Sequence, residues 1–334
     1  MQKRISRKRF LQICRTAIAG GSILGISGFI LRKNRLLQNG GLSVSENYAN
    51  GHDGHLISPY RLVSSFSVPD RIETFDLAGD SLIVAASNNI FIYDRTGRPL
   101  HHFSIRSNLR DLVADRAHIY LLFPARIEVY SYHGEKIREW EASGGSTDFC
   151  SIAVARDALF ATDAANKNIC RFTTDGNFVK FIDSPNGFVI PSYSFGIACV
   201  DDVVYCSNSG RHQVEKYSFD GDYLGAFGKA GGAAGMFCGC CNPVHIANTP
   251  SGEIITSEKG IPRISCYSRN GEFRSVLLDS KALGGGNTAY NVKVHDDRLL
   301  VAGGNQIAVF RYDKATAAKS ACSGCDVNCR LRSS

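Results

Sequence analysis

Outside its N-terminus the sequence carries almost no net charge. The formal charge of the 334-residue chain is +7, but residues 1–35 hold nine Lys and Arg residues and no Asp or Glu. The remaining 299 residues therefore have a formal charge of −2. A body this close to neutral offers no electrostatic attraction to a phosphate backbone, so the composition argues against nucleic acid as a partner.

The sequence also lacks an apolar run of the about 20 residues that a transmembrane helix usually needs. Its best candidate is residues 16–31, TAIAGGSILGISGFIL, an uncharged run with basic residues on both sides. Such a run after a basic region is typical of an export signal. No small-residue cleavage site follows Leu31 and no lipobox precedes Cys14. We therefore predict an uncleaved anchor with the body outside. The alternative is a surface amphipathic helix of a cytosolic protein.

The segment SRKRFLQ, residues 6–12, resembles the twin-arginine signal. Lys8 stands where that signal has its second arginine, so the general secretory route remains an alternative. The resemblance implies export of a folded protein, often with a metal or redox cofactor already loaded. We expect residues 1–35 to hold the body at the extracytoplasmic, periplasmic face of the cytoplasmic membrane, through a polar linker at residues 36–60.

One unit recurs along residues 61–314, and its recurrence decides the fold. The unit is an alternating strand, a turn with a glycine four residues after an aromatic, and a second strand. Copies lie at residues 89–103, 126–140, 168–182, 213–227 and 263–277, and a sixth at 306–314 stops at the turn. Two further short strands precede each copy, so every unit has four antiparallel strands, as a β-propeller blade does.

The truncated sixth copy lacks its outermost strand. Residues 61–69, RLVSSFSVP, alternate as a strand does and lie just before the first blade. We predict that they complete the sixth blade and close the ring, which removes an exposed sheet edge. The predicted fold is all-β, a six-bladed propeller with one N-terminal signal or anchor helix before it and a cysteine-rich tail at residues 315–334. One aromatic position is predicted to be core throughout: Phe91, Tyr130, Phe172, Tyr217 and Tyr267.

These units resemble NHL repeats, in which an apolar strand, a turn and a strand ending in Asp or Asn precede the pattern Ile-x-Val-Phe/Tyr. The resemblance covers the whole repeated region. It implies the propeller architecture without fixing a function, because this fold hosts enzymes, binding proteins and scaffolds alike.

One face of the predicted propeller carries the long loops. In an antiparallel blade, the loop leading into the innermost strand and the loop between the second and third strands emerge on the same side. For the fifth blade these loops are residues 227–243 and 257–263, and the long segment 184–196 leads into the fourth blade on that side. We call the surface formed by these three segments the cysteine face. The opposite face has tight turns, so the cysteine face is the predicted functional face.

Six cysteines lie in two short clusters: Cys238, Cys240 and Cys241 in GMFCGCCNP, and Cys322, Cys325 and Cys329 in the tail. Such spacings can ligate zinc or an iron–sulfur cluster. A metal centre that joins loop and tail is therefore the first hypothesis. The second is disulfides, either a vicinal Cys240–Cys241 bond or tail-to-loop bridges, which export favours. Packing of small residues, or a free redox thiol, is the third.

Polar residues near the loop are candidates for binding a cofactor or an anion, or for tuning a thiol. They are Glu258, Lys259, Arg263 and His212. An ion pair that only shapes the loop is the alternative. His245 is a further plausible ligand, but the sequence offers no three-histidine constellation of the kind a zinc or calcium propeller enzyme needs.

The pairing of GCCNP with SEKGxPR, in which Glu258, Lys259 and Arg263 lie, resembles a subgroup of exported, NHL-like bacterial proteins. That resemblance supports the fold and marks this region, and it implies no reaction.

The sequence therefore predicts a membrane-tethered propeller that binds or scaffolds an envelope protein partner. On this hypothesis it carries a cysteine-held metal or iron–sulfur centre in an envelope redox or assembly complex. One alternative is a metal-dependent lyase or hydrolase that works in the axial cavity of the cysteine face. Such an enzyme would need His or carboxylate ligands and an open coordination position near the axis. A second alternative is a disulfide-stapled interaction module without metal.

Overall fold

The structure is a computed structural model that describes residues 60–142 and 146–313. The chain divides into two units, Met1–Asn39 and Gly40–Ser334, and only the second contains described residues. The predicted N-terminal helix, the linker and the tail cysteines lie outside the described residues. Within the described part, no helix is long and apolar enough to cross a membrane.

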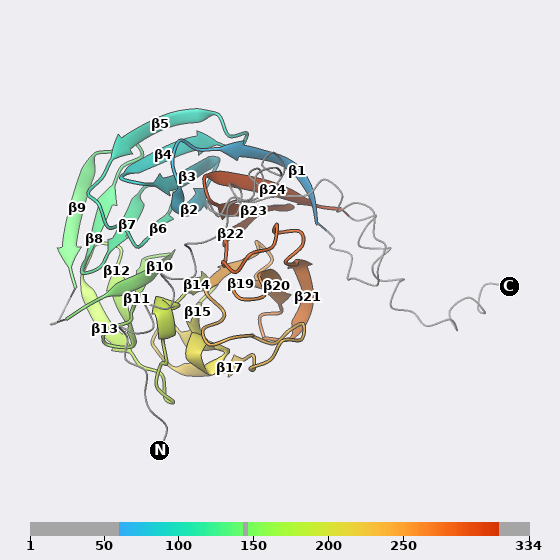
Figure 1. Cartoon of the computed structure of the whole chain (residues 1–334). Helices are drawn as coiled ribbons and strands as arrows, with labels where there is room; N and C mark the ends of the chain where they lie inside the picture. Colours follow the sequence, from blue (N-terminus) through green and yellow to red (C-terminus); the bar gives the residue numbers. More distant parts are fainter. Residues whose placement is uncertain (1–59, 143–145, 314–334) are drawn as a thin grey trace, which may run out of the picture. The chain divides into compact units, whose positions relative to one another are not determined.

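The described residues form six four-stranded antiparallel sheets, which surround a central axis as blades (Figure 1). In the first five blades the chain runs from the innermost strand outward. The first three blades are β2 (Ile72–Ala78), β3 (Ser81–Ala86), β4 (Asn89–Asp94) and β5 (Pro99–Ser104); β6 (Asp111–Ala114), β7 (Ile119–Phe123), β8 (Arg126–Tyr130) and β9 (Lys136–Glu141); and β10 (Phe149–Ala155), β11 (Ala158–Asp163), β12 (Asn168–Thr173) and β13 (Phe178–Ile182). The next two are β14 (Ile197–Val200), β15 (Val203–Asn208), β16 (Gln213–Ser218) and β17 (Tyr223–Phe227); and β18 (His245–Asn248), β19 (Ile254–Glu258), β20 (Arg263–Tyr267) and β21 (Phe273–Leu278).

The sixth blade combines the two ends of the repeated region. It contains β22 (Asn291–His295), β23 (Arg298–Gly303), β24 (Gln306–Tyr312) and, outermost, β1 (Tyr60–Ser67). β1 pairs antiparallel with β24, from Tyr60 opposite Tyr312 to Ser67 opposite Gln306. The predicted all-β, six-bladed propeller with an N-terminal closing strand is therefore confirmed.

The hydrophobic core lies between the blades. Six clusters of buried apolar side chains each join two neighbouring blades, so every blade buries both of its faces. The cluster between the third and fourth blades, for example, contains Phe160 and Tyr217, both fully buried. This packing fixes each innermost strand against the next, and that allows six separate strands to build one site at the axis.

The turn between the third and fourth strands carries the predicted glycine. Gly134 has a φ of 81°, and a Cβ at this position would lie 2.7 Å from the side chain of Phe103 in the preceding blade. The four other turns repeat the positive φ at Gly97, Gly176, Gly221 and Gly271. These positions require glycine because an L side chain would meet both backbone strain and the neighbouring blade.

The predicted core aromatic is buried in four of the five copies: Tyr130, Phe172, Tyr217 and Tyr267. In the first blade the prediction of Phe91 is wrong. Tyr93 is the buried residue there and Phe91 is half-buried, because Tyr93 is the aromatic that precedes the turn glycine by four residues.

Candidate functional site

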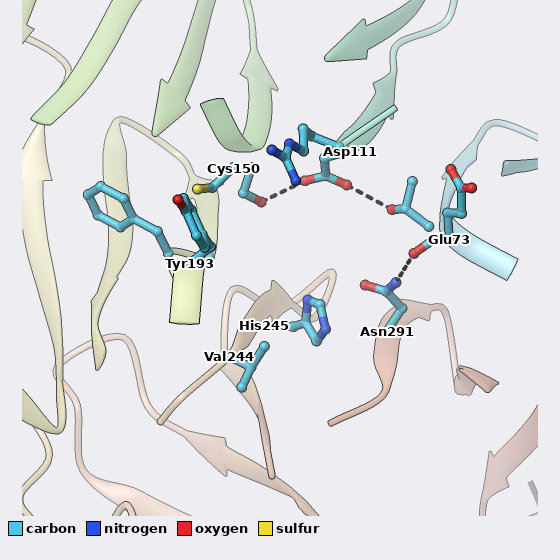
Figure 2. Close-up of a pocket in the computed structure, with 12 residues that line it drawn as sticks. Glu73, Asp111, Cys150, Tyr193, Val244, His245 and Asn291 are labelled. Atoms are coloured by element: carbon cyan, nitrogen blue, oxygen red, sulfur yellow. Dashed lines mark hydrogen bonds between the residues drawn. The ribbon is translucent and has the colours of Figure 1, made fainter. Parts of the chain in front are cut away.

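A polar pocket opens at the mouth of the central channel (Figure 2). Its volume is about 80 Å³. All six blades contribute to it, each from the beginning of its innermost strand or from the residues just before that strand. One lining residue from each blade, in chain order, is Thr74, Asp111, Ser151, Phe195, His245 and Asn291. Because these strands begin where the long loops end, the pocket opens on the cysteine face.

Asp111 joins three blades at the wall of the pocket. Its Oδ1 accepts a hydrogen bond from the Thr74 hydroxyl at 2.7 Å. Its Oδ2 accepts from the Ser151 hydroxyl at 2.6 Å and from the Ile152 N–H at 3.1 Å. A fourth donor, the Leu112 N–H, bonds Oδ1 at 2.9 Å. Four donors from three blades fix the carboxylate in one orientation, so it forms a rigid part of the wall.

His245 lies across the opening from Asp111 (Figure 2). Burial lowers the pKa of His245 to about 4. The negative charge of Asp111 opposes this shift, while Lys293 and Lys259 add to it. The ring is therefore neutral at physiological pH. No hydrogen bond to it is found among the described residues, so its nitrogen lone pair is free to accept a hydrogen bond or a proton.

A partly buried ion pair lies deeper in the channel. Lys293 donates to Asp76 at 2.9 Å, and Asp76 also accepts the Ala114 N–H at 2.8 Å. Lys293 and Asp76 each follow a pocket residue, Asn291 or Thr74, by two positions, which places them roughly 7 Å further along the channel. Burial lowers the pKa of Lys293, but the charges of Asp76 and Asp111 outweigh burial and raise it. The positive charge of Lys293 is thus balanced by the carboxylate of Asp76.

The rim of the pocket is formed by longer side chains. Arg110 makes an ion pair with Asp148 at 3.0 Å, and its guanidinium lies 6.0 Å from the ring of Tyr193. Tyr193 is 61% exposed. Asn291 donates to the carbonyl of Glu73 at 3.0 Å, which ties the sixth blade to the first (Figure 2). The rim therefore offers aromatic, cationic and anionic groups to a partner.

Asn242 holds the cysteine loop in place beside the pocket. It is buried, and its Nδ2 donates to the carbonyls of Cys238 and Lys259 at 2.6 and 2.8 Å. Its Oδ1 accepts the Lys259 N–H at 2.9 Å. The Cys238 thiol contacts the Lys259 carbonyl at 3.6 Å. The side chain of Asn242 thus joins the loop before β18 to the loop between β19 and β20.

Cys240 and Cys241 are neighbours in space as well as in sequence. Their Sγ atoms lie 3.3 Å apart, with Cys240 exposed and Cys241 buried. Burial opposes ionisation of Cys241, but hydrogen bonds from Lys259 and Cys240 outweigh it and hold the pKa of Cys241 below its usual value. The hydrogen bond with Cys241 and the charge of Cys241 raise the pKa of Cys240. Of the two thiols, Cys241 is therefore the one that ionises more readily.

The remaining predicted polar residues lie in different environments. Glu258 and Arg263 are buried and form an ion pair with an Nη2–Oε2 distance of 2.9 Å. Arg263 also donates to the carbonyls of Gly232 and Met236, so this pair supports the cysteine loop from behind. His212 has a φ of 58° and follows the short 3₁₀ turn η3 (Ser209–Arg211).

The structure therefore places Cys240 beside Cys241, and Cys238 against the carbonyl of Lys259. His212 does not line the pocket. Across residues 60–142 and 146–313, no three His, Cys, Asp or Glu side chains form a group that could hold a metal. The predicted ligands Cys322, Cys325 and Cys329 lie outside these residues, so a metal centre that includes them stays a prediction.

Cysteines on the strands are in apolar surroundings that suppress ionisation of their thiols. Burial raises the pKa of Cys150, Cys170 and Cys266 to about 12 in each case. Cys150 also lines the pocket.

The sequence-based reasoning named His245 but missed Asp111 and the other wall residues. One signal was present: small polar residues open otherwise apolar innermost strands, as at Thr74, Asp111 and Ser151. Each looks like an ordinary strand end by itself. Only the closed ring brings them to one place.

Comparisons with known proteins agree with the architecture. The family of the IFT80 second β-propeller matches residues 61–178. No curated protein shows significant sequence similarity to the chain.

Two similar solved structures are lyases. One is a catalytically inactive variant of virginiamycin B lyase from Staphylococcus aureus with quinupristin, with 15% identity and a TM-score of 0.54 over 73% of this chain and 82% of that one. The other is a streptogramin B lyase, with 14% identity and a TM-score of 0.57 over 76% of this chain and 98% of that one. At this level of identity the similarity shows the fold alone, a β-propeller.

Proposed function

We propose that this chain is a binding protein of the cell envelope that recognises a protein partner at the mouth of its central channel. The pocket carries the proposal, because all six blades place residues in it and His245 retains unused hydrogen-bonding capacity. Its volume of about 80 Å³ is far below the roughly 300–1,000 Å³ of pockets that enclose a whole drug-sized ligand. A side chain inserted from a partner fits this space, and the rim around it offers polar and aromatic contacts.

Position-specific crosslinking tests this proposal. A photoreactive amino acid at Tyr193, on the rim, should crosslink one discrete partner in intact cells. The same group at Asn270, an exposed position in a tight turn of the opposite face, is the matched control and should give no such product. His245→Ala in the Tyr193 background should weaken the crosslink. Equal crosslinking from both positions would contradict recognition at the pocket.

The proposal includes export and a membrane tether through residues 1–35. The basic flank and the uncharged run of that segment support it. The full chain should sediment with membranes and become accessible to protease when the outer surface of the cytoplasmic membrane is exposed. Deletion of residues 1–35 should leave the protein unexported. A full-length chain that stays protected from the protease would overturn this part while leaving the binding proposal open to its own test.

The metal or iron–sulfur centre remains the finer form of the proposal. Cys240 and Cys241 offer two adjacent thiols on the cysteine face, and thiolates are suitable ligands for zinc or iron. The Cys238 thiol contacts a backbone carbonyl instead. Metal and acid-labile sulfide should be measured on protein purified anaerobically after export. Bound metal that is lost on replacing Cys322, Cys325 and Cys329 with Ser would support a centre shared by loop and tail.

Catalysis in the pocket is a second candidate function, favoured by the neutral His245 facing a fixed carboxylate. A neutral histidine can accept a proton from a bound molecule. The solved structures with this fold include lyases, one of them with quinupristin. Incubation of the purified chain with quinupristin tests the nearest version of this idea. Conversion that is abolished by His245→Ala would establish an enzyme, and an unchanged compound would remove quinupristin as a substrate.

A further inference from the structure

We infer that Cys240 and Cys241 form a reversible dithiol–disulfide couple on the cysteine face, which exchanges with an exposed disulfide of a small molecule or a protein. The inference does not depend on what the pocket binds. It rests on three features of the described residues: the separation of the two sulfur atoms, their unequal exposure and the position of Lys259.

The two sulfur atoms are already close to bonding distance. They lie 3.3 Å apart, whereas a disulfide bond is about 2.05 Å long, so closure requires a shift of little more than 1 Å. Gly239 precedes the pair with a φ of 72° and has no atom near the position of a Cβ. The backbone next to Cys240 therefore has room to adjust.

Cys238 is excluded from the couple by its contacts. Its thiol contacts the Lys259 carbonyl at 3.6 Å and the Asn242 amide nitrogen at 3.8 Å. Both contacts belong to the network that holds the loop. The structure thus separates a structural cysteine from a reactive pair, although all three lie within four positions.

Unequal exposure gives the two thiols different roles. Cys240 is exposed and can reach a disulfide in solution, whereas Cys241 is only 2% exposed. Lys259 and Ser192 both act to lower the pKa of Cys241. The backbone of Lys259 is itself fixed by Asn242. The Lys259 ammonium lies 3.5 Å from the Ser194 hydroxyl, and its charge favours ionisation of the inner sulfur.

The exchange proceeds in two balanced steps. First, Cys240 loses its proton to solvent and attacks one sulfur of the external disulfide, and one external thiolate leaves. Second, Cys241 loses its proton to solvent and attacks Cys240 Sγ, which releases the second external thiolate. Two thiols and one external disulfide thus become a vicinal disulfide, two external thiolates and two protons. Both cysteines are oxidised and the external disulfide is reduced.

Oxidation would change groups that border the pocket. Ser192 contacts Cys241, Ser194 lies 3.5 Å from the Lys259 ammonium, and Tyr193 between them lines the pocket. Closing the disulfide removes the ionisable Cys241 thiol beside Lys259 and Ser192. Oxidation of the couple should therefore change the contacts of residues 192–194, which form part of the pocket rim.

The test is equilibration of the full-length protein in buffers of oxidised and reduced dithiothreitol, followed by alkylation and peptide mass analysis. Residues 230–259 lie in one tryptic peptide with all three loop cysteines. Under oxidising conditions this peptide should lose two hydrogen atoms, with only Cys238 alkylated, and reduction should restore three alkylated cysteines. Cys240→Ser should abolish the change, and Cys238→Ser should retain it.

Lys259 is tested as a positioning residue by its rate effect. Lys259→Gln should slow exchange with oxidised dithiothreitol roughly three- to ten-fold, and Lys259→Arg should restore most of the rate. A trivalent arsenical should bind the reduced wild-type protein but not Cys240→Ser. The inference is overturned by a bridge from Cys240 to Cys322, Cys325 or Cys329, by metal retained on Cys240 and Cys241, or by a pair that stays reduced throughout. None of these outcomes bears on crosslinking at Tyr193.

Discussion

His245 is surrounded by charged groups and remains neutral. Its folded-state pKa of about 4 lies below the value of 6.5 that the side chain has when solvated. Between these two values the unfolded chain binds more protons than the folded one. The contribution of His245 to stability is therefore fully present above pH 6.5 and is lost as the pH falls towards 4.

This linkage predicts a pH-dependent difference between the wild type and His245→Gln. From about pH 7.5 to about pH 5, the wild type should lose roughly 2 kcal/mol more unfolding free energy than the variant. Urea unfolding of both proteins at the two pH values measures the difference. An identical pH dependence would show that the ring is solvated in the folded protein and would remove the neutral histidine from the description of the pocket.

Asn242 should be among the residues whose truncation is most destabilising. Its side chain satisfies three backbone groups, and it is almost completely buried. Asn242→Ala leaves these groups without partners, so we expect a loss of about 2–4 kcal/mol in urea unfolding. The Cys238 thiol should also react faster with alkylating agents, because its loop loosens. Asn270→Ala, in an exposed turn, is the control and should change neither quantity.

The candidate site was only partly predictable at this scale. The face and the cysteine loop could be inferred, because antiparallel connectivity alone decides on which side a loop emerges. The pocket wall could not, because Thr74, Asp111 and Ser151 belong to three different blades and are far apart in the sequence. The structural role of Glu258 and Arg263 could not be predicted either. Both side chains are buried behind the cysteine loop, and nothing in the sequence SEKGIPR indicates this burial.

In the turn between the third and fourth strands, the backbone conformation and the packing against the neighbouring blade both require glycine. At Gly134 the positive φ and the contact with Phe103 both demand a missing Cβ. Gly134→Ala should lower the unfolding free energy by about 2–4 kcal/mol, from backbone strain together with overpacking. Gly232→Ala is the matched control, because no atom lies within 4 Å of the added Cβ. Equal stability of the two variants would mean that neighbouring blades can separate at this turn without cost.

The regularity of this element explains why the fold was predictable. A glycine four residues after a buried aromatic repeats in five blades, so the spacing located the third and fourth strands of those five. The one misassigned residue, Phe91, arose where two aromatics alternate in β4 and both satisfy a two-residue period. The glycine spacing selects Tyr93, which is the buried one. The loops follow no such repeat. Because they contribute much of the candidate site, its geometry could not be predicted in the same way.

Closure of the ring is a property of the whole molecule. β1 belongs to the sheet of the sixth blade, yet Phe66 of this strand packs against the first blade. Its ring lies 5.6 Å from that of Tyr93 and touches the space above Gly97. A single side chain of β1 therefore stabilises the contact between the last blade and the first, and the pocket needs both blades in place.

Phe66→Ala should consequently weaken two blades at once. We expect a loss of about 1–3 kcal/mol, since the side chain is half-buried. Amide hydrogen exchange should accelerate in β24 of the sixth blade and in β4 and β5 of the first, while β15 and β16 of the fourth blade respond least. Val63→Ala, at an exposed position of the same strand, is the control. If exchange accelerates in β1 alone, β1 is dispensable, and the other strands of the first and sixth blades keep the ring closed without it. If both flanking blades respond, the contact made by β1 is what joins the two ends of the propeller and keeps the channel mouth intact.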